Sequence, residues 1–63
     1  MSAPKIIPWS SDMPPCALCQ QVGVHKAGVY DVPTSLGPWA DLCFKHMTEY
    51  GVNIGIGFKR MKV

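Results

Sequence analysis

Two short cysteine-containing motifs constrain the fold more than any other feature of the sequence. Cys16 and Cys19 form a Cys-x-x-Cys motif, and after 23 intervening residues Cys43 and His46 form a Cys-x-x-His motif. Structural zinc sites take four Cys or His ligands in a tetrahedron, and two intervening residues let one turn of chain direct two side chains at one ion. The sequence therefore predicts a single structural Zn²⁺ bound by Cys16, Cys19, Cys43 and His46.

The length of the chain supports this prediction, because 63 residues form one small domain with little room for a self-sufficient core. Domains below roughly 70–80 residues usually need a covalent or metal staple. Three cysteines cannot all pair with one another, so a disulfide framework fits less well than a metal. The alternatives are buried free cysteines beside an ordinary surface histidine, or a redox pair at Cys16 and Cys19. A thioredoxin-like fold would not fit in a chain of this length.

The composition divides the chain into three parts. Residues 1–15 are a proline-rich N-terminal arm, residues 16–58 are the zinc-binding domain, and residues 59–63 are a basic C-terminal tail. The arm carries three large apolar residues, Ile6, Ile7 and Trp9. We expect them to lie across a small core, with a partner-binding strand as the alternative.

Local sequence patterns predict a small, zinc-stapled α+β fold. β-Branched and aromatic residues predict a hairpin with strands 28–32 and 39–42 and a turn at 33–37. Helix formers at 43–50, followed by Gly51, predict a short helix. Trp39 is expected to pack beside the metal as the main core aromatic.

After the helix, apolar residues alternate with polar residues and glycines from 52 to 58. This period of two predicts a final extended strand that covers the core. Its apolar face would consist of four side chains, Val52, Ile54, Ile56 and Phe58.

The order of these elements resembles that of treble-clef zinc fingers: a Cys-x-x-Cys knuckle, a hairpin, and a helix whose first turn supplies two ligands. Between Cys16 and about Lys59, the Gly-Pro-Trp at 37–39 and the glycine pattern at 51–57 resemble a family of short, uncharacterised zinc-finger proteins found in tailed-bacteriophage genomes. The resemblance implies a treble clef, one zinc ion and expression in the cytoplasm of an infected bacterium. It implies no enzymatic activity.

The residues also argue against catalysis. Four protein ligands close a zinc site to water, and only His25, expected to face solvent, remains as a further histidine. The glycine-containing segment at 51–59 lacks the Gly-Lys-Ser/Thr ending of a phosphate loop. We therefore expect a non-catalytic module without a small-molecule substrate.

The distribution of positively charged residues suggests a binding partner. The net charge is +2, and half of all Lys and Arg residues lie in the last five positions, at Lys59, Arg60 and Lys62. With Lys45 on the predicted helix, and Trp39 or Phe44 for base stacking, they predict nucleic-acid binding. The alternative is a protein-interaction module, such as a phage adaptor or an inhibitor of a host protein, because aromatic and methionine residues are enriched at interfaces. The relevant residues are Trp9, Trp39, Met13, Met47 and Met61.

The sequence predicts no membrane association. Two prolines interrupt the first eight residues, where a signal peptide would need a long apolar run, and no stretch approaches the ~18 apolar residues of a membrane span. We therefore expect a soluble protein of the cytoplasm.

Overall fold

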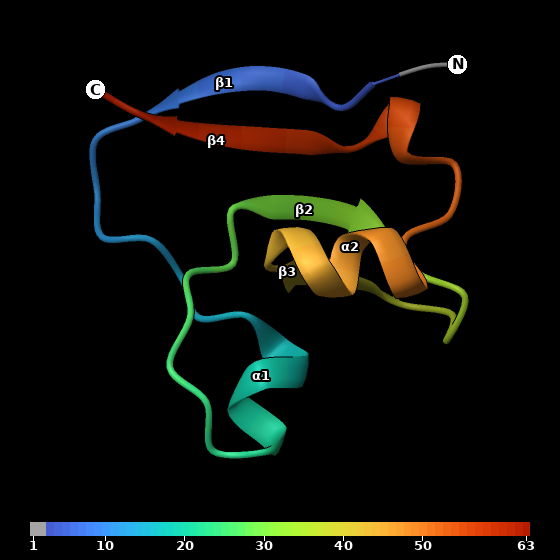
Figure 1. Ribbon diagram of the computed structural model, residues 1–63. Coiled ribbons are helices and arrows are strands. Elements are labelled where there is room, and N and C mark those ends of the chain that lie inside the picture. The colour runs from blue at the N-terminus through green and yellow to red at the C-terminus, as the bar shows by residue number, and fades with distance from the viewer. Residues whose placement is uncertain (1–2) are drawn as a thin grey trace.

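Four strands form one sheet, in the order β1-β4-β2-β3, in the computed structural model, which describes residues 3–63 (Figure 1). β1 runs parallel to β4, whereas β4 with β2 and β2 with β3 are antiparallel. The strands are β1 (Lys5–Trp9), β2 (Tyr30–Pro33), β3 (Trp39–Leu42) and β4 (Phe58–Lys62).

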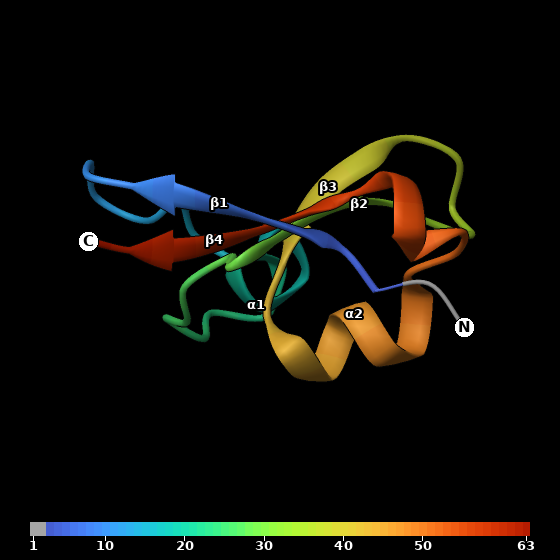
Figure 2. The ribbon, with the colours of Figure 1, turned by 90° about the horizontal axis from the view of Figure 1, so that it is seen from above.

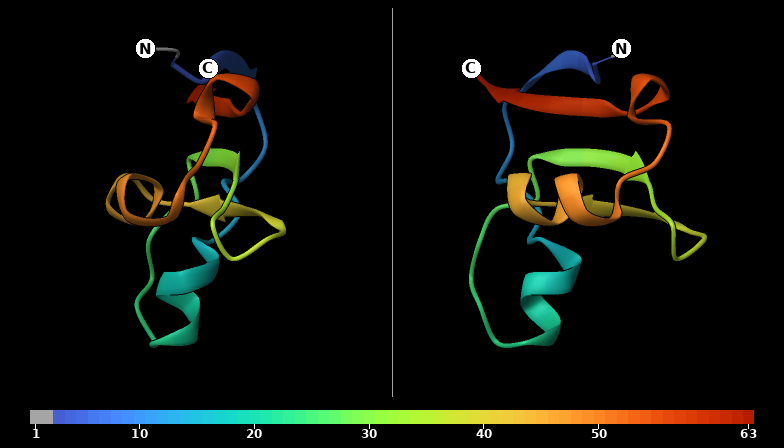
Figure 3. Two further views of the ribbon diagram at one scale, coloured as in Figure 1. Left: turned by 90° about the vertical axis from the view of Figure 1, so that its right-hand side faces the viewer. Right: turned by 45° about the vertical axis from the view of Figure 1, so that its right-hand side comes forward.

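Two short α-helices and one 3₁₀ turn complete the α+β fold: α1 (Ala17–Gln21), α2 (Phe44–Tyr50) and η1 (Ile54–Ile56). α2 packs on one face of the sheet, over β2 and β3 (Figure 2). α1 lies beyond β3 (Figure 3), which it contacts. Within residues 3–63, no helix covers the opposite face of the sheet. None of these helices has the length and apolar character of a membrane span.

The hairpin and the second helix are confirmed. The hairpin strands run 30–33 and 39–42, so the first begins two residues later than expected, and α2 begins directly after Cys43. Gly51 follows the helix with an ordinary φ of −66°, but a Cβ there would lie 2.5 Å from the carbonyl oxygen of Met47. Glycine is therefore needed for a close approach and not for a left-handed turn.

The prediction of a single strand at 52–58 is wrong. Asn53 adopts a left-handed conformation with φ 50°, η1 follows, and β4 begins only at Phe58. Asparagine tolerates this conformation better than most residues, so the chain turns where an unbroken strand was expected. Gly57 brings the chain against β2, where a Cβ would lie 2.5 Å from the Val32 side chain. Close packing thus accounts for the glycines at 51 and 57.

Residues expected in terminal extensions belong to the sheet. The expected basic tail forms most of β4, between β1 and β2, and part of the N-terminal arm forms β1. The first two residues of the arm lie outside the described part of the chain. Lys5 donates its N–H to Gly57 on the β4 side, so the backbone of Pro8, three positions later, points to the outer edge. Proline is tolerated there because no ladder bond is lost.

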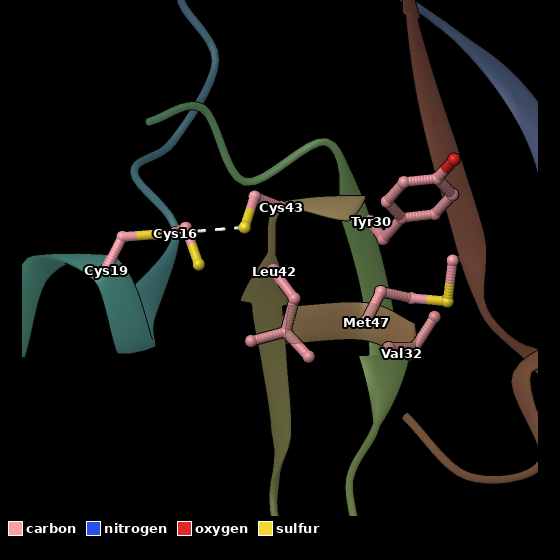
Figure 4. Close-up of a cluster of buried hydrophobic side chains, with 7 residues drawn as sticks. All are labelled: Cys16, Cys19, Tyr30, Val32, Leu42, Cys43 and Met47. Atoms are coloured by element: carbon pink, nitrogen blue, oxygen red, sulfur yellow. Dashed lines mark hydrogen bonds between the residues drawn. The ribbon is translucent and has the colours of Figure 1, made fainter. Parts of the chain in front are cut away.

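The core lies between α2, the β2–β3 hairpin and the cysteine motifs (Figure 4). Its buried residues are Cys16, Cys19, Tyr30, Val32, Leu42, Cys43 and Met47. Tyr30, and not Trp39, is the buried aromatic residue. Trp39 is 46% exposed, because strand alternation directs Leu42 towards α2 and Trp39 to the other face, where its ring lies 6.5 Å from that of Phe58.

The exposure of Trp39 gives a first testable prediction. Trp39→Ala should lower the free energy of unfolding by less than about 1 kcal/mol, because the ring is half in water. Leu42→Ala, at a fully buried position of the same strand, should cost about 2–5 kcal/mol. Denaturant melts of the two variants at a fixed free metal concentration check the difference. Equal costs would show that Trp39 belongs to the core.

Candidate metal centre

Two segments far apart in the sequence carry the four predicted ligands. Cys16 caps the start of α1 and Cys19 lies within it, so a helical turn links the first pair. Cys43 caps the start of α2, and His46 lies in its first turn. A helix turns about 100° per residue, so positions three apart share a face, and each motif directs both side chains to the same side.

Backbone hydrogen bonds hold the first motif in place. Cys16 donates its N–H to the carbonyl of Lys26, and Gly28 donates to the carbonyl of Pro14, so the chain entering α1 pairs with the chain leaving it. Val24 donates to the carbonyl of Cys19. These bonds close the α1 segment into a small loop with a fixed position for both thiols.

The four ligand atoms converge on one point. The Sγ atoms of Cys16, Cys19 and Cys43 and Nδ1 of His46 all lie within 4.8 Å of one another. Nδ1 is 3.3, 3.3 and 3.4 Å from the three sulfurs, and the sulfurs of Cys19 and Cys43 are 3.7 Å apart. A tetrahedron with metal–sulfur bonds of about 2.3 Å and metal–nitrogen bonds of about 2.0–2.1 Å has edges of about 3.8 Å and 3.6 Å. These four separations agree with the corresponding edges within about 0.3 Å.

Burial and hydrogen bonds within the cluster shift the pKa values of two of the thiols in opposite directions. Burial raises the pKa of Cys16, but hydrogen bonds from the backbones of Cys19 and Cys43 and from His46 outweigh burial and lower it to about 6. Burial and the neighbouring thiols Cys16 and Cys43 raise the pKa of Cys19 to about 11. A bound cation would favour deprotonation of the thiols, because the thiolate is the form of cysteine that ligates a metal.

His46 approaches all three thiols with Nδ1, a choice that the sequence does not reveal. Its ring lies 6.1 Å from that of Tyr50, on the next turn of α2. When Nδ1 is a ligand, the proton of neutral imidazole is on Nε2, on the other side of the ring. The centre therefore has the composition Cys₃His and could hold one metal ion.

The four ligands form the only group of this kind within residues 3–63 that could hold a metal. His25 is exposed, as expected, and does not belong to it. The three cysteines are buried and form no disulfide. Sequence spacing thus identified every member of the centre.

The residues predicted to form a basic binding surface do not all lie on one face of the sheet. Lys59 and Lys62 lie on opposite faces of β4, Lys45 is on α2, and Trp39 is on the face away from α2. Arg60 is only 8% exposed, so its expected role in a basic surface is corrected by the structure. The predicted cluster is divided because consecutive strand residues point to opposite faces.

Arg60 is part of an ion-pair network that sequence analysis missed. Its Nη1 donates to the carbonyl of Gly28 and its Nη2 to Oδ1 of Asp41, both at 2.8 Å. Oδ2 of Asp31 lies 3.7 Å from Nη2, and the guanidinium lies 4.8 Å from the centre of the Trp9 ring. A signal was present, because Asp31 and Asp41 are directly paired in the hairpin and two opposed carboxylates need a cation.

Comparisons with known proteins gave no relative. A scan against protein-family models, a search of curated proteins and a search of solved structures each found no match to this chain.

Proposed function

We propose that the chain is a non-catalytic, zinc-stabilised protein-interaction module of the treble-clef type. The convergence of three thiols and one imidazole nitrogen within 4.8 Å carries the metal part of this proposal. Thiolate and imidazole donors in a tetrahedron favour Zn²⁺ over oxygen-seeking cations. Four protein ligands leave no position for a reactive water, which supports a structural role. The proposed setting is the cytoplasm of an infected bacterium.

Exposed apolar side chains favour a protein partner. Within residues 3–63, ten large hydrophobic residues are exposed, against seven buried hydrophobic residues in the core. They include Trp39, Phe44 and Met61, residue types that are enriched at protein interfaces. Protein binding was the weaker of the two functions expected from the sequence, and the exposed apolar surface now makes it the better supported one.

The distribution of cations gives less support to nucleic-acid binding. Duplex or single-stranded binding by charge needs several Lys or Arg side chains along one groove. Arg60 is paired with carboxylates, and Lys59 and Lys62 lie on opposite faces of β4. Lys59, Arg60 and Lys62 therefore cannot together contact three phosphates of one nucleic-acid strand.

A titration tests this proposal. Metal-loaded protein added at low salt to fluorescent duplex and single-stranded oligonucleotides should show no saturable binding below about 100 μM, where non-specific contacts of basic proteins are normally seen. Saturable binding that weakens steeply with salt would overturn the protein-interaction proposal and restore the nucleic-acid function.

A further inference from the structure

The half of the sheet formed by β1 and β4 has an uncovered surface on the α2 side. α2 packs on β2 and β3, and Figure 1 shows β4 and β1 beyond its edge, with no helix in front of them. Strand alternation places Ile6, Lys59 and Met61 on this side, since Lys59 pairs with both Ile6 and the core residue Tyr30. These side chains therefore lie on the same face of the sheet as the helix, beside it.

Aromatic contacts connect this surface of β1 and β4 to α2. The Tyr30 side chain lies beside β4 (Figure 4), and its ring centre is 6.2 Å from that of Phe44, the first residue of α2. Phe44 is 64% exposed, Ile6 60% and Met61 44%. We call Ile6, Phe44, Lys59 and Met61 the ledge.

The ledge has an uncompensated positive charge. The Lys59 ammonium lies 5.8 Å from the centre of the Tyr30 ring, and both salt bridges found among residues 3–63 belong to Arg60. Asp31 and Asp41 lie on the opposite face of the sheet with Arg60. Lys45 and Glu49 are one turn apart on α2 and offset each other in charge. Lys59 is thus a cation among apolar side chains, and no carboxylate of residues 3–63 pairs with it.

We propose that the ledge binds a segment of a partner protein that carries a carboxylate flanked by apolar side chains. The carboxylate pairs with Lys59, and the apolar groups pack on Ile6, Phe44 and Met61. A cation set among apolar groups gains most from a partner that supplies both a counter-charge and apolar area. This inference rests on the proposed protein-interaction function.

Two features define the mode of binding. A single lysine in apolar surroundings matches a carboxylate better than the repeated phosphates of a nucleic acid, which need several cations. Addition of a partner strand to the edge of β1 is opposed by Pro4 and Pro8. Both occupy positions whose backbone faces outward, where proline offers no N–H donor. Recognition is therefore through side chains on the face of the sheet.

Selection from a displayed library of random peptides tests the inference. The bait is the full chain loaded with zinc, and enriched peptides are resynthesised and titrated against the wild type and four variants. Lys59→Glu and Phe44→Ala change the ledge. Lys62→Glu makes the same charge change on the same strand but the opposite face, and Leu36→Ala removes an equally exposed apolar group from the hairpin turn. Circular dichroism and zinc content show that every variant is folded.

The enriched peptides should combine Asp or Glu with large apolar residues. Lys59→Glu and Phe44→Ala should each weaken their binding by about tenfold or more, whereas the two control variants should change it less than about twofold. Selection on Lys59→Glu should enrich Lys or Arg in place of the acids. Peptides that bind all variants equally would overturn the ledge but keep the interaction function. Failure to enrich any peptide would overturn both.

Discussion

Removal of the metal is expected to unfold the chain. Zinc binding to structural sites in small fingers contributes about 10–16 kcal/mol. A domain of this size, at roughly 0.05–0.15 kcal/mol per residue, has a total stability of only about 3–9 kcal/mol. Three of its seven core residues are ligands, so the centre and the core are lost together. A strong chelator should therefore abolish the helical circular dichroism and the dispersion of amide resonances.

The chain supplies its own matched pair of variants for this experiment. His46→Ala removes a ligand and should give the unfolded spectra of the chelated protein, whereas His25→Ala removes the other, exposed histidine and should change neither fold nor metal content. Acid should act in the same direction as the chelator, because protons compete with the ion for the thiolates as pH falls. Native mass spectrometry gives the mass of the bound ion. A folded, metal-free monomer would contradict the prediction.

The metal centre was predictable from sequence because its information is local. Cys16 with Cys19, and Cys43 with His46, are each separated by two residues, and a single turn of helix or loop is enough to bring such pairs together. The hairpin and α2 were predictable for the same reason, since turn residues and helix formers act within a few positions. What spacing could not provide was the identity of the ligating nitrogen, which depends on where α2 meets α1.

The C-terminal region was mispredicted because its structure depends on distant partners. The alternation from 52 to 58 fits a strand by periodicity, but the left-handed Asn53 and the close packing of Gly57 against Val32 place the strand later. The later start of the strand changes the role of Arg60. As part of a free tail Arg60 would have been available to phosphates. In β4 it lies against the carboxylates of Asp31 and Asp41 in the β2–β3 hairpin. Local charge counting cannot distinguish these cases, because the sheet order is a long-range property.

Arg60→Ala is therefore expected to be a folding mutation and to remove no binding contact. It leaves Asp31 and Asp41 opposite each other without their cation and removes the group under Trp9. Breaking a buried ion pair costs about 3–5 kcal/mol, and we expect about 3 kcal/mol because both carboxylate side chains are 36% exposed. Lys62→Ala, two residues along the same face of β4, should change stability by no more than about 0.5 kcal/mol.

Two further variants separate charge pairing from packing at Arg60. Arg60→Lys should recover only part of the loss, because one ammonium cannot repeat the separate bonds of Nη1 to Gly28 and Nη2 to Asp41. Arg60→Met combined with Asp31→Asn and Asp41→Asn should approach wild-type stability, since no carboxylate is then left unpaired. Urea midpoints at a fixed free zinc concentration measure all four variants, because bound metal contributes to apparent stability. If Arg60→Ala melts with the wild type, the network does not hold β4 in the sheet, and Arg60 is again free to serve as a binding residue.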